Sequence, residues 1–175
     1  MNKDAEGIES FETVYETVFP LLYRIAFHIT GSQDIAEEMC QEAFIRYFKR
    51  TSPLPSIEDA KYWLIRVVKN LCYNHEKRRG REHQAYRKVF LTPARIPETG
   101  ETLVLKTEAE QLIQKALLAV PYKLRSPLVL KEYGEMNYRQ IAKVLGISEG
   151  NVKVRIFRAR QALEKILITE DLHVS

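Results

Sequence analysis

The sequence predicts an all-α protein of two small helical domains joined by a flexible linker, with a helix-turn-helix at its C-terminal end. Along most of the 175 residues, apolar side chains recur at helical spacings of three and four, and no segment alternates as a half-buried strand does. Between residues 82 and 106 this periodicity fades and two prolines and a glycine occur, which indicates a linker. Near the C-terminus, a short turn beginning at Gly146 separates two amphipathic segments. We therefore expect an N-terminal domain at 1–81, the linker at 82–106 and a C-terminal domain at 107–175.

The first two predicted helices are delimited by residues that end or begin helices. The first should be broken or kinked near Pro20, because proline removes a backbone donor, and Gly31 should end it. The second begins at Ser32 or Asp34, both good N-cap residues, and continues to about Lys49. Each has an apolar stripe wide enough to pack against its neighbours.

The third helix follows a loop over Thr51–Ser56, where two prolines in three residues prevent a helix. Ser56 with Asp59 resembles a capping box, so a long helix should begin here and run to about Arg79. One side of it carries an apolar stripe that we assign to the core: Ala60, Trp63, Leu64, Val67, Val68, Leu71 and Cys72.

The C-terminal domain is predicted to begin with another capping box, formed by Thr107 and Glu110. Pro121 starts a further helical segment, which Gly134 should end. Both segments carry leucines at helical spacing, so each can contribute one face to a small core.

The helix-turn-helix is predicted from its caps. Asn137 with Gln140 should cap the first helix, Gly146 can adopt the positive φ that ends it, and Ser148 should cap the second. The second helix has a regular apolar stripe and basic residues on its other faces. Such a helix suits the DNA major groove. The alternative interpretation is a helical hairpin with a solvated basic face.

The composition agrees with a protein that has two real cores and a charged surface. Apolar residues make up 45% and charged residues 29% of the chain, and no apolar run is long enough to span a membrane. The N-terminus is acidic and has no apolar segment of the kind found in secretion signals, so we expect a cytoplasmic protein. Cys40 and Cys72 lie in apolar stripes and form no Cys-x-x-Cys pair, which predicts reduced core cysteines.

Charge is distributed unevenly along the chain. Residues 1–45 hold two basic against nine acidic residues, a net charge of −7. Residues 69–88 and 137–165 each hold seven basic against two acidic residues, a net charge of +5. Two separate basic segments indicate a polyanion that is contacted at two places.

The third helix has a second face in which bases, aromatic rings and an amide are interleaved: Tyr62, Arg66, Lys69, Asn70, Tyr73 and Lys77. This mixture suits single-stranded nucleic acid, because cations follow the phosphates and rings stack on unpaired bases. An ordinary solvated helix face is the alternative.

The second helix carries a band of acidic and amide side chains opposite its apolar face. A carboxylate cluster can bind a metal, but helical di-metal sites use Glu-x-x-His pairs, which this helix lacks. It can also be a solvated face, or a docking surface for a basic partner helix. We expect no metal, no cofactor and no catalytic residues: the four histidines show no metal-ligand spacing, and no nucleophile or phosphate-loop motif occurs.

Three segments in order, DIAEEMCQEAFIRYF (34–48), YWLIRVVKNLCYNHEKRRGR (62–81) and the C-terminal helix-turn-helix, resemble the extracytoplasmic-function group of sigma-70-type transcription initiation factors. The resemblance covers roughly residues 10–81 and 107–167. It implies a protein that binds core RNA polymerase, directs it to promoters and assists melting. It also implies an anti-sigma protein as a further partner.

The resemblance also implies three groups of site residues. Those expected to dock on polymerase are Asp34, Glu37, Glu38, Gln41, Glu42 and Phe44. Those expected to hold single-stranded DNA at the −10 element are Tyr62, Arg66, Lys69, Asn70, Tyr73, Asn74, Lys77 and Arg78. Those expected to read duplex DNA at the −35 element are Ser148, Asn151, Lys153, Arg155 and Arg158.

Four residues depart from the pattern common in the family. Glu38 stands where aspartate is usual, and Asn74 also replaces aspartate. Asn151 stands where threonine is common, and Phe157 where histidine often occurs. The last three lie on helices expected to face DNA, so they leave the promoter sequence open.

A different class of function is a stand-alone repressor or activator that binds palindromic duplex DNA as a dimer. It requires a dimerisation helix with a long apolar seam, and no sustained heptad pattern occurs in the chain. It also leaves the aromatic face of the third helix without a role. An enzyme such as a nuclease or deaminase is the third class, for which no motif is present.

Overall fold

The computed structural model describes residues 9–90 and 107–174, and within these ranges it contains seven α-helices and no strand. The predicted all-α class is therefore confirmed. The acidic residues of 1–8 and the part of the predicted linker at 91–106 lie outside the described residues.

Helix α1 spans Phe11–Thr30, and its first turn is capped by Ser10, whose Oγ accepts a hydrogen bond from the backbone N–H of Thr13. Of the break or kink expected near Pro20, the break is wrong, because the helix continues through this residue. Pro20 lies on the exposed side of α1, where water can satisfy the carbonyl that a proline leaves without a donor. Gly31 ends the helix with φ of 72°.

Helix α2 spans Gln33–Phe48 and is capped by Ser32. Helix α3 spans Ile57–Phe90, and the predicted cap is present, since Ser56 Oγ accepts a hydrogen bond from the backbone N–H of Asp59. The helix continues eleven residues beyond Arg79, so the prediction that it ends near this residue is wrong. Gly80 weakens a helix by only about 1 kcal/mol, and no proline follows it before residue 93.

The C-terminal domain contains four helices: α4 (Glu108–Ala119), α5 (Tyr122–Glu132), α6 (Tyr138–Leu145) and α7 (Glu149–Val174). The predicted capping box of Thr107 and Glu110 forms, and the predicted cap of Asn137 and Gln140 is a capping box as well. In each box the two residues exchange side-chain to backbone hydrogen bonds, which satisfy N–H groups that the first turn leaves free.

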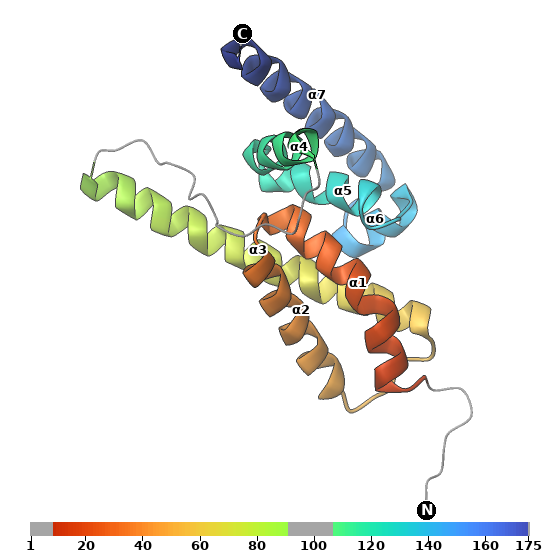
Figure 1. Ribbon diagram of the computed structural model, residues 1–175. Coiled ribbons are helices and arrows are strands. Elements are labelled where there is room, and N and C mark those ends of the chain that lie inside the picture. Colours follow the sequence, from red (N-terminus) through yellow and green to blue (C-terminus); the bar gives the residue numbers. More distant parts are fainter. Residues whose placement is uncertain (1–8, 91–106, 175) are drawn as a thin grey trace, which may run out of the picture.

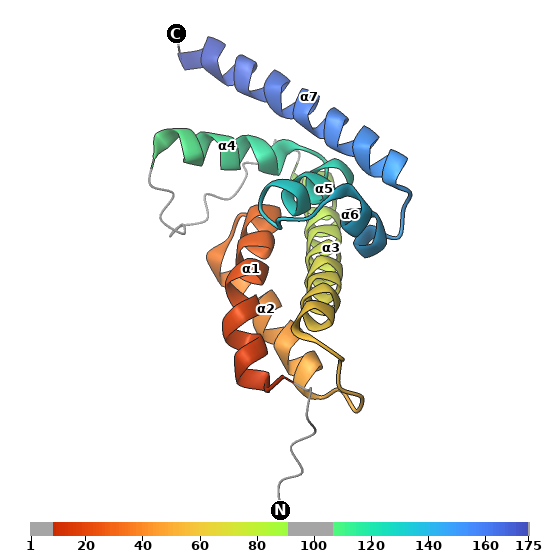
Figure 2. The same cartoon turned by 90° about the vertical axis from the view of Figure 1, so that its right-hand side faces the viewer.

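The two domains pack against each other and share one continuous apolar core. Helices α1, α2 and α3 form one bundle, and α4, α5 and α6 lie between α1 and α3 on one side and α7 on the other (Figures 1 and 2). Ile25 and Phe27 of α1 are fully buried, as are Leu130 of α5 and Ile156 of α7. In the described parts of the chain, none of the helices is both long enough and apolar enough to cross a membrane.

Candidate nucleic-acid and polymerase-docking surfaces

Helices α6 and α7 form the predicted helix-turn-helix. Gly146 ends α6 with φ of 66°, and the backbone N–H of Ile147 donates to the carbonyl of Ala142 over 3.1 Å. Ser148 Oγ accepts a hydrogen bond of 3.1 Å from the backbone N–H of Asn151, so it caps α7 as predicted. The buried Ile141 and Val152 anchor the two helices in the domain core.

The first turns of α7 present the predicted duplex-binding residues to solvent. Ser148, Asn151, Lys153 and Arg158 are exposed, and Arg155 is half-buried. Arg155 Nε donates to Asn151 Oδ1 over 3.1 Å, which holds the guanidinium beside the amide. A basic helix whose first turns are exposed in this way can enter a major groove.

Two apolar side chains lie on the same exposed part of α7 and were absent from the predicted set. Val154 is 45% exposed and Phe157 is 61% exposed. They are spaced by three residues and lie outside the buried stripe of Val152, Ile156 and Ala159. This departure from the apolar stripe is the signal that could have identified them.

The interleaved face of α3 is largely open to solvent. Six of the eight predicted residues are exposed, namely Arg66, Asn70, Tyr73, Asn74, Lys77 and Arg78. Lys77 Nζ lies 6.0 Å from the centroid of the Tyr73 ring, so cation and ring share one region. The other two, Tyr62 and Lys69, are half-buried. Burial lowers the pKa of the Lys69 ammonium, and the nearby Arg66 lowers it further.

The acidic surface of α2 consists of Asp34, Glu37, Glu38, Gln41 and Glu42, and the first four are exposed. Gln41 Nε2 donates to Glu37 Oε1 over 3.3 Å, and Arg46 Nε donates to Glu42 Oε1 over 2.8 Å. Glu42 is thus paired with Arg46 of the same helix. Asp34 and Glu38 add further negative charge to this surface.

Phe44 requires a correction, because it was predicted to dock on polymerase with the acidic residues. Its side chain is only 3% exposed and lies 4.8 Å, between ring centroids, from Tyr15. The ring centroids of Phe11 and Phe19 lie 6.0 and 6.1 Å from that of Phe44. Phe44 therefore packs α2 against α1 and leaves little of its side chain accessible to a partner.

Two family models match the chain, "Sigma-70 region 2" at residues 14–82 and "Sigma-70, region 4" at residues 110–163. The RNA polymerase sigma-H factor of Pseudomonas aeruginosa is 30% identical over 158 residues, which cover 86% of this chain and 80% of that protein. The chain belongs to the sigma-70 family of sigma factors. The similarity to the ECF RNA polymerase sigma factor SigW of Bacillus subtilis, 28% identical over 167 residues that cover 91% of this chain and 89% of SigW, agrees with the extracytoplasmic-function group.

A solved structure also resembles this sigma factor over most of its length. It is the sigma factor RpoE of Bartonella quintana in complex with the anti-sigma factor NepR, with 27% identity and a TM-score of 0.64, covering 90% of this chain and 96% of RpoE. These family matches and sigma-factor relatives confirm the fold, the family and the promoter-directing function expected from the resemblance.

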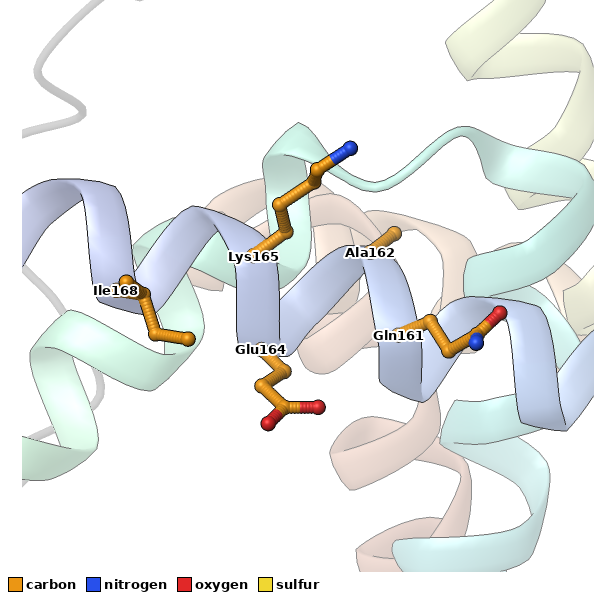
Figure 3. Close-up of a pocket in the computed structure, with 5 residues that line it drawn as sticks. All are labelled: Gln161, Ala162, Glu164, Lys165 and Ile168. Atoms are coloured by element: carbon orange, nitrogen blue, oxygen red, sulfur yellow. The ribbon is translucent and has the colours of Figure 1, made fainter.

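The α2 surface and the α3 face of the sigma factor fall within the region 2 match, and the α7 face falls within the region 4 match. A hollow along the second half of α7 lies beyond the predicted DNA-binding residues and is lined by Gln161, Ala162, Glu164, Lys165 and Ile168 (Figure 3). All five side chains belong to one helix, which cannot enclose a ligand by itself.

Both cysteines of the sigma factor are free and buried, as predicted. Burial raises the pKa of the Cys40 thiol to about 12, and burial likewise raises the pKa of Cys72. Thiols with such pKa values are poor nucleophiles and poor metal ligands at neutral pH. Among the described residues, no group of three or more His, Cys, Asp or Glu side chains could hold a metal ion.

Proposed function

We propose that the sigma factor docks on core RNA polymerase through the acidic surface of α2. The exposed carboxylates of Asp34, Glu37 and Glu38 form a row of negative charge on one helix. Such a row orients a basic partner surface and raises the rate of encounter, and like charges on a wrong partner oppose binding. Phe44 supports this surface from the core.

The exposed face of α3 holds the unpaired strand of the −10 element in this proposal. Tyr73 offers a ring for stacking, which typically stabilises a bound base by about 1–3 kcal/mol. Asn70 and Asn74 offer amides that can read base edges, and Lys77 and Arg78 neutralise phosphates. Tyr62 and Lys69 belong to the same face but lie at its covered edge.

The exposed turns of α7 read the duplex −35 element in the same proposal. Asn151, Lys153 and Arg158 supply donors for base edges and phosphates. Phe157 and Val154 add apolar contacts of the kind that recognise thymine methyl groups.

The single observation that carries the proposal is that three chemically different surfaces are exposed on three separate helices of one chain. The surface of α2 is acidic, that of α3 is aromatic and basic, and that of α7 is basic and apolar. Together they fit a protein that joins polymerase to two forms of DNA. The sigma factor acts by binding and not as an enzyme, and it works in the cytoplasm with RNA polymerase. Because the RpoE relative is bound by an anti-sigma factor, we propose a partner of that class here too.

The test is co-elution of the purified sigma factor with bacterial core RNA polymerase on a sizing column. Wild type is compared with Glu38→Lys/Glu42→Lys, which reverses two charges on α2. The matched control is Glu12→Lys/Glu16→Lys, which reverses two exposed charges on α1. We expect a one-to-one complex for wild type and the control, and its loss for the α2 variant.

Each other outcome has a definite meaning. A complex that survives the α2 substitutions would move the docking surface elsewhere. Equal loss in both variants would mean that net charge, and not this surface, controls binding. If the wild-type protein does not bind polymerase and instead binds duplex DNA as a dimer, a stand-alone repressor or activator becomes the better assignment.

A further inference from the structure

One hydrogen bond on α7 joins two side chains of the surface that is proposed to read the −35 element. Arg155 Nε donates to Asn151 Oδ1 over 3.1 Å, between residues one helical turn apart. Asn151 is exposed, whereas Arg155 is half-buried. The asparagine is therefore the more accessible member of the pair, and the arginine lies behind it.

The position of Asn151 suits contact with a base. It lies in the first turn of α7, and the N-terminal residues of a helix in the major groove are those that reach base edges. Its backbone N–H donates to Ser148 Oγ over 3.1 Å, which fixes this turn. At the neighbouring Gly150, a Cβ would meet no atom within 4 Å, so the helix surface beside Asn151 is open. A base edge can therefore approach the amide closely.

The hydrogen bond from Arg155 determines which way the Asn151 amide faces. A guanidinium has N–H donors and no acceptor, so the amide atom that faces Arg155 must be the oxygen. The amide nitrogen, with its N–H donors, then points away from Arg155. The arginine occupies one side of the oxygen, and its positive charge opposes the approach of a further donor to the other side. Together the two side chains therefore offer donors.

A set of donors distinguishes the purines in a major groove. Guanine presents two acceptors there, N7 and O6, whereas adenine presents the acceptor N7 and the donor group at N6. An asparagine whose oxygen and nitrogen are both free matches adenine, because it can accept from N6 and donate to N7. An asparagine whose oxygen is held by an arginine matches guanine, because both acceptors of that base meet donors.

The pair depends on a residue in which this chain differs from the pattern common in its family. Asn151 stands where threonine is common. A threonine side chain carries one hydroxyl, with a single O–H donor, and has no amide nitrogen. The base preference that the pair creates is therefore a property of this chain and cannot be carried over from relatives that have threonine.

We propose that the Asn151–Arg155 pair makes the sigma factor select guanine at one position of the −35 element. The proposal rests on the proposed reading of duplex DNA by α7. Asn151 donates from its amide nitrogen to the guanine. Arg155 is a positioning residue that holds the amide oxygen and places positive charge beside the guanine acceptors. The preference belongs to the pair, so the loss of either member changes it.

The test is the selection of promoter sequences by the complex of the full-length sigma factor with core RNA polymerase. The complex is incubated with duplex fragments randomised over the promoter region, and the bound DNA is sequenced. Asn151→Ala identifies the position in question, because it removes the preference that this side chain creates. Arg155→Met removes the donor to Asn151 and keeps an unbranched stem for the half-buried part of the side chain.

At the identified position, we expect the wild type to prefer guanine to adenine by roughly tenfold or more, as a good base contact does. Arg155→Met should shift this preference toward adenine, because the oxygen of Asn151 becomes free. The matched control is Arg158→Met, which removes the same charge three residues further along α7. It should weaken binding and keep the guanine preference, because the Asn151–Arg155 pair stays intact.

A second substitution keeps the proposal testable if Arg155→Met fails to fold. Asn151→Asp retains a partner for Arg155 but removes the amide N–H donors. The guanine preference should then be lost in favour of cytosine, whose N4 amino group donates to carboxylates in the major groove. Asn151 is exposed, so this substitution removes no packing contact from the core.

Three results would overturn the proposal. Adenine at the identified position in the wild type would contradict a set of donors. A guanine preference that survives Arg155→Met would show that Arg155 does not position the amide. A uniform loss of affinity for Asn151→Ala, with no change of preference at any position, would mean that the pair contacts phosphates. In all three cases the wild-type complex still selects a −35 sequence, so the proposed function stands. A wild-type complex that selects no −35 sequence would instead reject the reading of duplex DNA by α7.

Discussion

Exposure divides the residues of α7 into those that hold the helix in place and those that are proposed to contact DNA. Val152 and Ile156 are buried in the domain core, whereas Phe157 is 61% exposed. A phenyl ring on a DNA-facing turn has a physical use, because it can pack on a thymine methyl group in the major groove.

We predict that Phe157→Ala weakens promoter binding by the complex with polymerase by about tenfold, the effect of losing roughly 1–2 kcal/mol of base contact. The melting temperature should stay near that of wild type, since the ring is exposed. Binding is measured by fluorescence anisotropy on a labelled promoter.

The matched control for this prediction is Ile168→Ala, which removes an apolar side chain that is 54% exposed on the same helix but beyond the DNA-facing turns. It should leave binding unchanged. Equal losses in the two variants would contradict a role for Phe157 in base contact.

The residue scale also explains why the burial of Phe44 was not expected from the sequence. Phe44 lies three residues after Gln41 and seven after Glu37, so a helical projection puts it at the edge of the acidic surface. Its burial depends on Phe11 and Tyr15 of α1, whose positions cannot be derived from the sequence of α2.

Element boundaries depend on capping and on backbone conformation. The helix-turn-helix contains two glycines, one in a left-handed backbone conformation and one within a helix. Gly146 ends α6 at φ of 66°, a left-handed conformation that disfavours any residue with a Cβ. Gly150 lies inside the first turn of α7, and a Cβ there would meet no atom within 4 Å.

We predict that Gly146→Ala lowers the free energy of unfolding by about 1 kcal/mol, whereas Gly150→Ala raises it by about 0.5–1 kcal/mol. Chemical denaturation followed by circular dichroism measures both. If both substitutions destabilise the protein, Gly146 and Gly150 do not differ in backbone conformation as described.

The length of α3 illustrates the limit of composition as a guide to helix ends. Gly80 and the fading apolar pattern indicated a linker from residue 82, yet the helix continues to Phe90. Charged and long side chains are good helix formers, and a single glycine within a helix costs only about 1 kcal/mol relative to alanine, so Gly80 does not have to end α3. The spacing of apolar residues indicates which face of a helix is buried, so a helix that is exposed on all sides shows little apolar periodicity.

At the scale of the whole molecule, a buried histidine lies in the interface between α1 and the C-terminal domain. The His28 ring is buried and stacks on Tyr133 of the C-terminal domain at 3.5 Å between centroids. Its Nδ1 pairs with Gln114 Oε1 over 2.5 Å. Burial lowers the pKa of His28, the nearby Arg24 lowers it further, and the hydrogen bond to Gln114 partly opposes the shift.

We predict that acidification lowers the stability of the folded protein through His28. Because its pKa is lower in the folded than in the unfolded chain, this contribution to stability is fully present above the unfolded value of 6.5 and is lost as pH falls below it. Unfolding free energies measured between about pH 8 and pH 5 should therefore fall more steeply for wild type than for His28→Phe, which keeps a ring against Tyr133 but cannot titrate. If the unfolding free energies of wild type and His28→Phe fall in parallel with pH, His28 is not the cause of the pH dependence.

The sequence by itself determined the all-α class, most helix boundaries and the composition of the three surfaces. Those features depend on local physics, since caps such as Asn137 with Gln140 act over three residues and apolar stripes repeat within one helix. Only the tertiary structure decided that the domains close on each other, that Ile65 is buried and that Tyr62 and Lys69 lie at a covered edge. The interface joins Tyr122 to Lys69 across 53 positions and His28 to Gln114 across 86, and contacts at such separations leave no periodic signal in a single chain.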